Sequence, residues 1–154
     1  MVVRPAGPDD AAALVGLLRA GALGPPYEDP DALDAYASAL VDIAATDGDH
    51  VLVAELDGRV VGTCQLITFR HLQHRGGRCA EIESMHVMPE LRGQGIGGVL
   101  LEAAVGLARS AGCYRVQLTS NAARTDAHRF YERHGFAPSH VGFKRVLPPG
   151  DGRA

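Results

Sequence analysis

Four glycines lie within the ten residues PELRGQGIGG, Pro89 to Gly98. A helical pattern of apolar residues begins inside this run, at Ile96, and continues to Ala111. The N-terminus of a helix offers unpaired backbone N–H groups and the positive end of the helix dipole, and glycines let a phosphate approach the main chain closely. The pattern therefore predicts an anion site, with a glycine turn that binds nothing as the alternative.

Two common phosphate motifs do not explain this run. Gly93, Gly95 and Gly98 match the spacing of the dinucleotide fingerprint, but the segment QLTSN, where that motif needs an acidic residue, contains none. No Gly-Lys-Ser/Thr follows, which excludes a P-loop. Arg92 stands directly before the glycines and adds positive charge.

Two carboxylates precede the glycine run on a predicted strand that ends at Pro89. Glu81 and Glu83 are two residues apart, so both face one side of the strand, and His86 is expected on the opposite face. Acidic residues on a central strand are costly unless they face a cavity or are paired. They are candidates for accepting a proton, and a salt bridge with Arg70 or Arg78 is the alternative.

Basic and sulfur-containing residues gather just before these carboxylates, in the stretch FRHLQHRGGRC. His71, His74 and Cys79 lack a fourth ligand at zinc spacing, so we expect no metal. The basic side chains could instead receive a phosphonate or carboxylate of a substrate, with a solvated loop as the alternative. The turn-rich loop GALGPPYEDP could line the same pocket. The candidate substrate-binding residues are Tyr27, Arg70, His71 and His74.

The elements that must position these residues alternate in type. Helical spacing predicts helices over 11–20, with Asp9 or Asp10 as the cap, and over 31–45. Asp57-Gly58 predicts a type I′ hairpin between two strands. Further strands are expected at 79–88, 114–120 and 139–147, with helices from Gly95 to Gly112 and over 125–135. We expect an α/β fold and a single domain, 1–154.

Composition narrows the class of protein. The 154 residues carry a well-mixed net charge of -3, without the basic stripe of a nucleic-acid binder. Three widely spaced cysteines are typical of reduced thiols in a cytoplasmic protein. Asp9 and Asp10 disfavour a signal peptide, and no apolar stretch is long enough to span a membrane.

Two stretches resemble the GNAT family of N-acetyltransferases. VMPELRGQGIG is similar to its acyl-CoA signature through Arg92, Gly95 and Gly97, and LTSN followed by AHRFYERHGF resembles its next strand and helix. Within that family the chain is most similar in pattern to aminoalkylphosphonate N-acetyltransferases. The resemblance implies a mixed central sheet of six to seven strands, with a splay between the fourth and fifth strands, flanked by four helices.

The resemblance also implies acetyl-CoA as cosubstrate. Its pyrophosphate would bind the backbone from Arg92 to Gly98, and its pantetheine arm would pair with the splayed strand as an extra strand would. A backbone N–H, expected to be that of Met85, would polarise the thioester carbonyl. Asn121 would contact the cofactor arm or cap a turn. The implied cofactor-binding residues are Met85, His86, Val87, Arg92, Gly93, Gln94, Gly95, Ile96, Gly97, Gly98, Asn121 and Tyr131.

The implied catalytic residues are Glu81, Glu83 and Tyr131. Glu81 aligns with the base of the aminoalkylphosphonate group and is ranked slightly ahead of Glu83, which aligns with the base of many other members. Tyr131 would protonate the departing thiolate. The expected function is acetyl transfer to a primary amine of a small molecule, such as an aminoalkylphosphonate, in a ternary complex. Two alternatives are acetylation of a protein N-terminus or lysine, and acyl-CoA binding without catalysis; a homodimer is left open.

Overall fold

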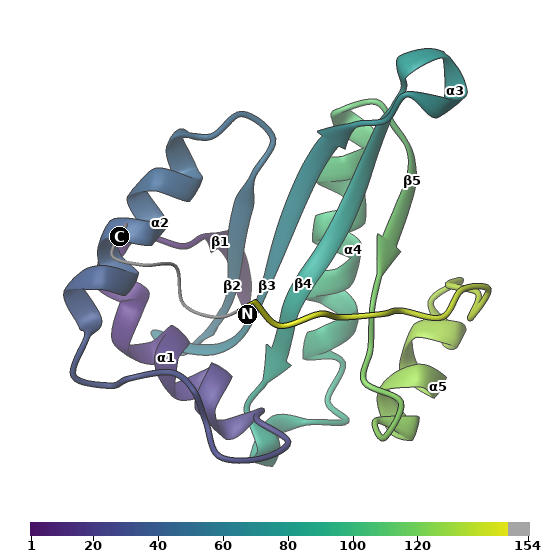
Figure 1. Ribbon diagram of the computed structural model, residues 1–154. Coiled ribbons are helices and arrows are strands. Elements are labelled where there is room, and N and C mark those ends of the chain that lie inside the picture. Colours follow the sequence, from purple (N-terminus) through teal and green to yellow (C-terminus); the bar gives the residue numbers. More distant parts are fainter. Residues whose placement is uncertain (148–154) are drawn as a thin grey trace. The chain divides into compact units, whose positions relative to one another are not determined.

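The computed structural model describes residues 1–147, and the chain divides into two compact units, Met1–Leu118 and Thr119–Ala154. The first unit contains the β-sheet and most of the helices (Figure 1). Among residues 1–147, no helix is long and apolar enough to cross a membrane. Cys64, Cys79 and Cys113 are free thiols.

The sheet has five strands in chain order: β1 (Val2–Pro5), β2 (His50–Leu56), β3 (Arg59–Arg70), β4 (Arg78–Val87) and β5 (Cys113–Leu118). Neighbouring strands are antiparallel except β4 and β5, which are parallel. The predicted α/β class with a mixed sheet is confirmed.

The predicted strand count of six to seven is wrong for the described residues. The segment SHVGFKRVL, 139–147, forms no strand, and its side chains at Val141 and Phe143 are exposed. Apolar and other residues alternate only around Val141 and Phe143. After Phe143 the alternation is interrupted by Lys144 and Arg145, which are followed by two adjacent apolar residues.

Three long helices cover the two faces of the sheet in the first unit. They are α1 (Ala11–Ala20), α2 (Leu33–Ala45) and α4 (Ile96–Ser110). A Cβ at Gly62 of β3 would lie 2.9 Å from the Leu100 side chain of α4, whereas the next residue, Thr63, lines a pocket with side chains of α1 and α2. Since side chains alternate along a strand, α4 covers one face and α1 with α2 the other (Figure 1).

The turn between β2 and β3 sets which residues of β3 face α1 and α2. Asp57 and Gly58 both have positive φ, 50° and 76°, as the predicted type I′ turn requires.

The short elements η1 (Pro8–Asp10), α3 (Gln73–Gly76) and η2 (Pro89–Leu91) complete the first unit.

The core between α1, α2 and the sheet is formed by Ala11, Leu14, Leu40 and Val53. On the other face, Leu100, Leu101 and Ala104 of α4 are fully buried. Burial of each of these leucine and valine side chains contributes about 1.5–3 kcal/mol, so both helix layers fix the strands that position the site.

Asp10 does not cap α1 through its side chain, contrary to our expectation. Its carboxylate instead receives two hydrogen bonds from the Arg4 guanidinium, at 2.7 and 2.9 Å, and one from the Gly7 amide at 2.8 Å. The Arg4 hydrogen bonds are the largest cause of the lowered pKa of Asp10, and burial opposes them.

An Arg4→Met variant is expected to lose less stability than the wild type between pH 5 and pH 3. A carboxyl with a lowered pKa stabilises the fold above its ordinary pKa, and that contribution disappears as the pH falls through the folded-state value. Melting temperatures across this range measure the difference. Arg109→Met, at an exposed helix end, is the control and should retain the wild-type pH dependence; equal slopes for Arg4→Met and wild type would contradict the assignment.

The second unit contains one helix, α5 (Thr125–Arg133), within its described residues 119–147. The ring of Phe130 packs against those of Tyr131 and His134, with centroids 5.1 and 4.4 Å away. Gly135, with φ of 84°, follows the helix, as predicted for its C-terminus.

Candidate active site

Both candidate carboxylates lie on β4, on the face covered by α1 and α2. Glu81 pairs with Ile67 and Glu83 with Gln65 of β3, and Gln65 lines the pocket on that face. Directly opposite residues of two strands share a face. Glu81 and Glu83 are half-buried, so both can face an enclosed substrate.

Glu81 is held by a side chain of the neighbouring strand. Gln117 Nε2 donates to Glu81 Oε2 at 3.1 Å, and the thiol of Cys79 donates to Gln117 Oε1 at 3.7 Å. Arg115 Nε in turn donates to Cys79 Sγ at 3.3 Å, and this bond is the largest cause of the raised pKa of Arg115. The chain of bonds fixes the orientation of Gln117 and therefore of the Glu81 carboxylate.

The arginines proposed as alternative partners make other contacts. Arg78 forms an ion pair with Asp47 at 3.3 Å, and Arg70 Nη1 donates to the Gly76 carbonyl at 3.1 Å. These contacts direct both guanidinium groups toward the hairpin end of the sheet. Neither of these contacts joins an arginine to Glu81 or Glu83.

A β-bulge in β4 corrects the expected direction of His86. Glu83 pairs with Gln65 and His86 with Thr63, so a single residue of β3 opposes Ser84 and Met85. Ser84 has a positive φ of 51°, a conformation that is rare for residues other than glycine and is typical of such sites. The extra residue reverses the alternation, and His86 lies on the same face as Glu83.

The contacts of His86 agree with this placement. A Cβ at Gly21, the residue that ends α1, would lie 2.0 Å from His86 Nδ1. The imidazole therefore packs against the C-terminal end of α1. The prediction that His86 faces away from the carboxylates was wrong because alternation in a sequence cannot reveal a bulge.

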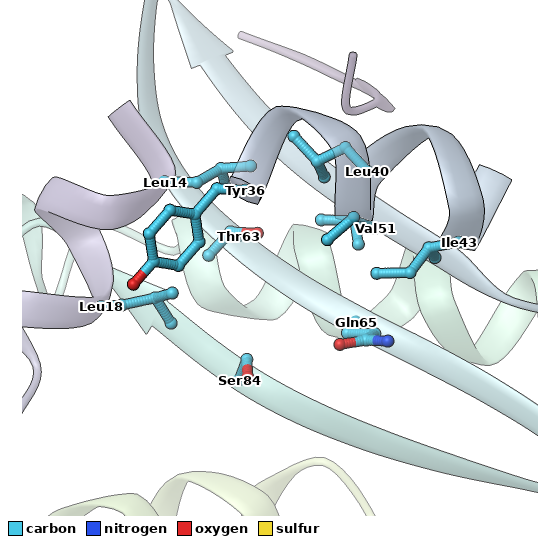
Figure 2. A pocket seen from close by; sticks show the side chains of 10 residues that line it. Leu14, Leu18, Tyr36, Leu40, Ile43, Val51, Thr63, Gln65 and Ser84 are labelled. Carbon is cyan, nitrogen blue, oxygen red and sulfur yellow. The ribbon is translucent and has the colours of Figure 1, made fainter. Parts of the chain in front are cut away.

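A pocket of about 170 Å³ lies beside the bulge, between α1, α2 and strands β2 to β4 (Figure 2). Leucine, isoleucine and tyrosine side chains from the two helices form one wall, and Gln65 and Ser84 lie on the strands opposite them. The lining residues are Leu14, Leu18, Tyr36, Ala39, Leu40, Ile43, Val51, Thr63, Gln65 and Ser84.

One edge of β4 is left without a strand partner next to this pocket. The ladder between β4 and β5 ends at the pair Ile82 and Leu118, whereas β4 continues to Val87. The backbone from Glu83 to Val87, which includes Met85, therefore has no β5 partner in the described part of the chain. This is the position at which the two strands were expected to splay.

The glycine run forms the N-terminus of α4, as predicted. Gly95 occupies the cap position with φ of 84°, and no side chain caps the helix. Val99 donates the first intrahelical bond, to the Gly95 carbonyl at 3.1 Å, so the preceding amides have no helical acceptor. A Cβ at Gly93 or Gly95 would meet no atom within 4 Å, so the space beside the Cα atoms of these glycines is open.

Arg92 lies at the entrance to this loop. Its Nε donates to the Val87 carbonyl at 3.2 Å, which ties the loop to the end of β4. The two terminal nitrogens of the guanidinium remain to interact with an anion. Gln94 is exposed between the two glycines of positive φ.

The predicted basic cluster forms an aromatic group at the hairpin between β3 and β4. Tyr114 lies 4.0 Å from His74 between ring centroids, and its hydroxyl is 3.3 Å from His71 Nδ1. Arg70 and Tyr27 are exposed, Tyr27 completely. Within residues 1–147 no three histidine, cysteine or acidic side chains come together as a metal site would require.

Two predicted residues belong to the second unit. Asn121 Oδ1 accepts a hydrogen bond from the Ala123 amide at 2.9 Å, which is the turn-capping alternative that we weighed for it. Tyr131 is half-buried on α5 and contacts the ring of Phe136, with centroids 6.0 Å apart.

Sequence reasoning did not identify the residues of the pocket. Thr63 and Gln65 come from β3 and Tyr36 comes from α2, and these residues share no sequence motif. The only signal was Gln65, an amide side chain inside the largely apolar strand VVGTCQLITF. Polar residues on a buried strand face are candidates for lining a cavity.

Comparisons with known proteins agree with this geometry. The model of the acetyltransferase (GNAT) family matches residues 18–136. An aminoalkylphosphonate N-acetyltransferase from Salmonella typhimurium is 40% identical over 114 residues, which cover 74% of this chain and 71% of that protein.

Two further relatives cover nearly the whole chain. The aminoglycoside N(6')-acetyltransferase type 1 of Stenotrophomonas maltophilia is 32% identical over 152 residues, 96% of this chain and 94% of that protein. The solved structure of a transcriptional regulator from Bacillus halodurans superposes with a TM-score of 0.88 at 32% identity, and the match covers 95% of this chain and 99% of that one.

Proposed function

This chain belongs to the GNAT acetyltransferase family and is an acetyl-CoA-dependent N-acetyltransferase, and on that premise we propose that its acceptor is the primary amine of a small molecule. The observation that supports this acceptor is the position of Glu83 on β4. Glu83 supplies a carboxylate where the backbone edge without a β5 partner begins, and it lies next to the pocket of about 170 Å³.

The residues present fit the cosubstrate. The uncapped amides at the start of α4 suit the pyrophosphate of acetyl-CoA, because they supply free donors and the positive end of the helix dipole. Arg92 adds a cation beside them. The edge from Glu83 to Val87 offers backbone donors and acceptors to the amides of the pantetheine arm, as to an added strand.

The carboxylates of β4 are the groups that would remove a proton from the acceptor amine. An alkyl amine has a pKa near about 10 and arrives as an ammonium ion, which cannot attack a thioester until it loses a proton. Glu83 lies next to Ser84 and opposite Gln65, both of which line the pocket, whereas Glu81 is bonded to Gln117. We therefore place Glu83 ahead of Glu81 as the proton acceptor, the reverse of the order from sequence.

Two further roles rest on the family pattern. The Met85 amide lies in the bulge of the unpartnered edge, a position from which it would stabilise negative charge on the thioester oxygen. Tyr131 matches, in the sequence pattern of the family, the tyrosine that would protonate the CoA thiolate. Together the steps form the amide bond and break the carbon–sulfur bond, and release CoA thiol and one proton.

An aminoalkylphosphonate is the specific acceptor that the Salmonella relative suggests. A pocket of about 170 Å³ is small for a peptide segment, which argues against a protein N-terminus or lysine as acceptor. The combination of a carboxylate and a pocket argues against a module that only binds acyl-CoA.

The experiment is an assay of thiol release from acetyl-CoA with 2-aminoethylphosphonate, an amino sugar, a polyamine, a simple alkylamine and a lysine peptide. We expect release with at least one small amine above the amine-free background, and none with the peptide. Release with the peptide alone would favour protein acetylation. CoA binding without release from any amine would favour the binding module.

We also propose that both compact units form one acetyltransferase domain, since the family match spans them. A cytoplasmic location is supported by three free thiols. A homodimer is also proposed, with the exposed side chains of Val141, Phe143, Val146 and Leu147 as candidate contacts.

A further inference from the structure

The pocket beside the bulge is apolar and uncharged. The ten lining residues, all within the described chain, include no arginine, lysine, histidine, aspartate or glutamate. Figure 2 shows Tyr36, Leu14 and Leu18 at one end, Ile43 at the other, and Leu40 and Val51 between them. A ligand group inside this pocket would contact mostly hydrocarbon.

Two of the polar groups around the pocket are already bonded elsewhere. Thr63 Oγ1 donates to the Leu52 carbonyl at 2.9 Å. The Tyr36 hydroxyl accepts from the Asp29 amide at 3.0 Å. The neutral Gln65 and Ser84 side chains lie on the strand side, next to Glu83 (Figure 2). The polar side chains that are left for a ligand therefore lie on the strand side of the pocket, where the amine would react.

An anionic group has no counter-charge in this pocket. Burial of a phosphonate or phosphate without a cationic partner is costly, and proteins use arginine or lysine for this purpose. The predicted basic cluster starts at Arg70, five residues beyond Gln65 along β3, or roughly 16 Å at strand spacing. Arg70 is exposed at the hairpin and outside the pocket lining.

We propose that the pocket binds an uncharged apolar substituent of the acceptor amine, of the size of a phenyl ring or a short alkyl chain. The proposal rests on the proposed function: the ammonium group lies at Glu83 and the apolar body lies between α1 and α2. An apolar cavity of about 150 Å³ in another protein binds benzene, which shows that a pocket of this size accepts such a group. The preferred acceptor is therefore an arylalkyl or alkyl amine, in contrast to the phosphonate that the Salmonella relative suggests.

The test compares 2-phenylethylamine with 2-aminoethylphosphonate, which share the aminoethyl chain and differ in the terminal group. We expect kcat/KM for 2-phenylethylamine to be at least about tenfold higher than that for 2-aminoethylphosphonate. An apolar group that fits a hydrophobic pocket changes kcat/KM by about this factor. A rate for 2-aminoethylphosphonate equal to or above that of 2-phenylethylamine would overturn the proposal.

An Ala39→Phe variant fills the pocket from its mouth, where Ala39 is exposed on α2. It should lower kcat/KM for 2-phenylethylamine about tenfold and lower that for ethylamine less, because ethylamine lacks the group that occupies the pocket. Ala35→Phe, one turn earlier and outside the lining, is the matched control and should match the wild type. Equal effects of Ala39→Phe on both amines would overturn the proposal.

Binding separates this proposal from the proposed function. Ligand-observed NMR of 2-phenylethylamine in the presence of CoA should show binding that Ala39→Phe weakens and Ala35→Phe does not. If no amine releases thiol but this binding pattern holds, acetyl transfer to small amines fails and the apolar pocket stands. If amines are acetylated and 2-phenylethylamine does not bind, the apolar pocket fails and acetyl transfer stands.

Discussion

At pH 7, a Glu83→Gln variant is expected to have a kcat/KM for acetyl transfer about 100-fold below that of the wild type, the scale of general base catalysis. Glutamine keeps the size and the strand position of Glu83 but cannot accept the proton of the ammonium ion. The defect should shrink as the pH rises toward about 10, because the free amine then reaches the enzyme already deprotonated. Initial rates from pH 6 to pH 10 measure it.

Three comparisons make this result specific. Glu102→Gln, on the exposed face of α4, should be indistinguishable from the wild type. Glu81→Gln should cause a smaller loss, since Glu81 is bonded to Gln117 and lies two residues farther than Glu83 from Ser84, which lines the pocket. The Kd for CoA should be unchanged in all three variants. A greater loss for Glu81→Gln than for Glu83→Gln would move the base to Glu81.

A Gln94→Glu variant is expected to weaken CoA binding about tenfold, measured by isothermal titration calorimetry. Gln94 is exposed between Gly93 and Gly95 at the start of α4, where the pyrophosphate is proposed to bind. Two unit charges about 4 Å apart repel by about 1 kcal/mol in water and more near a protein surface, and 1.4 kcal/mol corresponds to tenfold.

The matched control for this variant is Gln73→Glu, which makes the same chemical change at the exposed hairpin. Its Kd for CoA should equal that of the wild type, and the difference between the two variants should decrease at high salt because screening weakens exposed charge interactions. An unchanged Kd for Gln94→Glu at low salt would remove the pyrophosphate from the α4 N-terminus.

Local patterns predicted the parts of the fold that local chemistry determines. The first helix, the Asp57-Gly58 turn and the start of α4 at Ile96 agree with the sequence analysis. In each case the signal is short-range: apolar spacing, two residues that tolerate positive φ, or glycines before a helix. The parallel pairing of β4 with β5 was not readable in this way, because it depends on contacts between distant segments.

The wrong predictions at the site also concern features that depend on contacts between distant segments. The bulge at Ser84 and Met85 leaves no mark in the sequence, since neither residue is a glycine, and it reverses the face of His86. The pocket required knowledge of how α1 and α2 pack on the sheet. The apolar content of SHVGFKRVL predicted a strand, but a strand also needs backbone pairing with another strand, and this segment is not part of a strand ladder.

We expect the backbone amides at the start of α4 to bind the diphosphate of the cosubstrate. This binding can be followed through the backbone amide signals in ¹⁵N-resolved NMR spectra as CoA, or pantetheine without the diphosphate, is added. The amides of residues 93–98 should shift with CoA and not with pantetheine, while those of residues 83–87 should shift with both. Saturation with CoA that leaves residues 93–98 unshifted, with the largest changes elsewhere, would contradict this expectation.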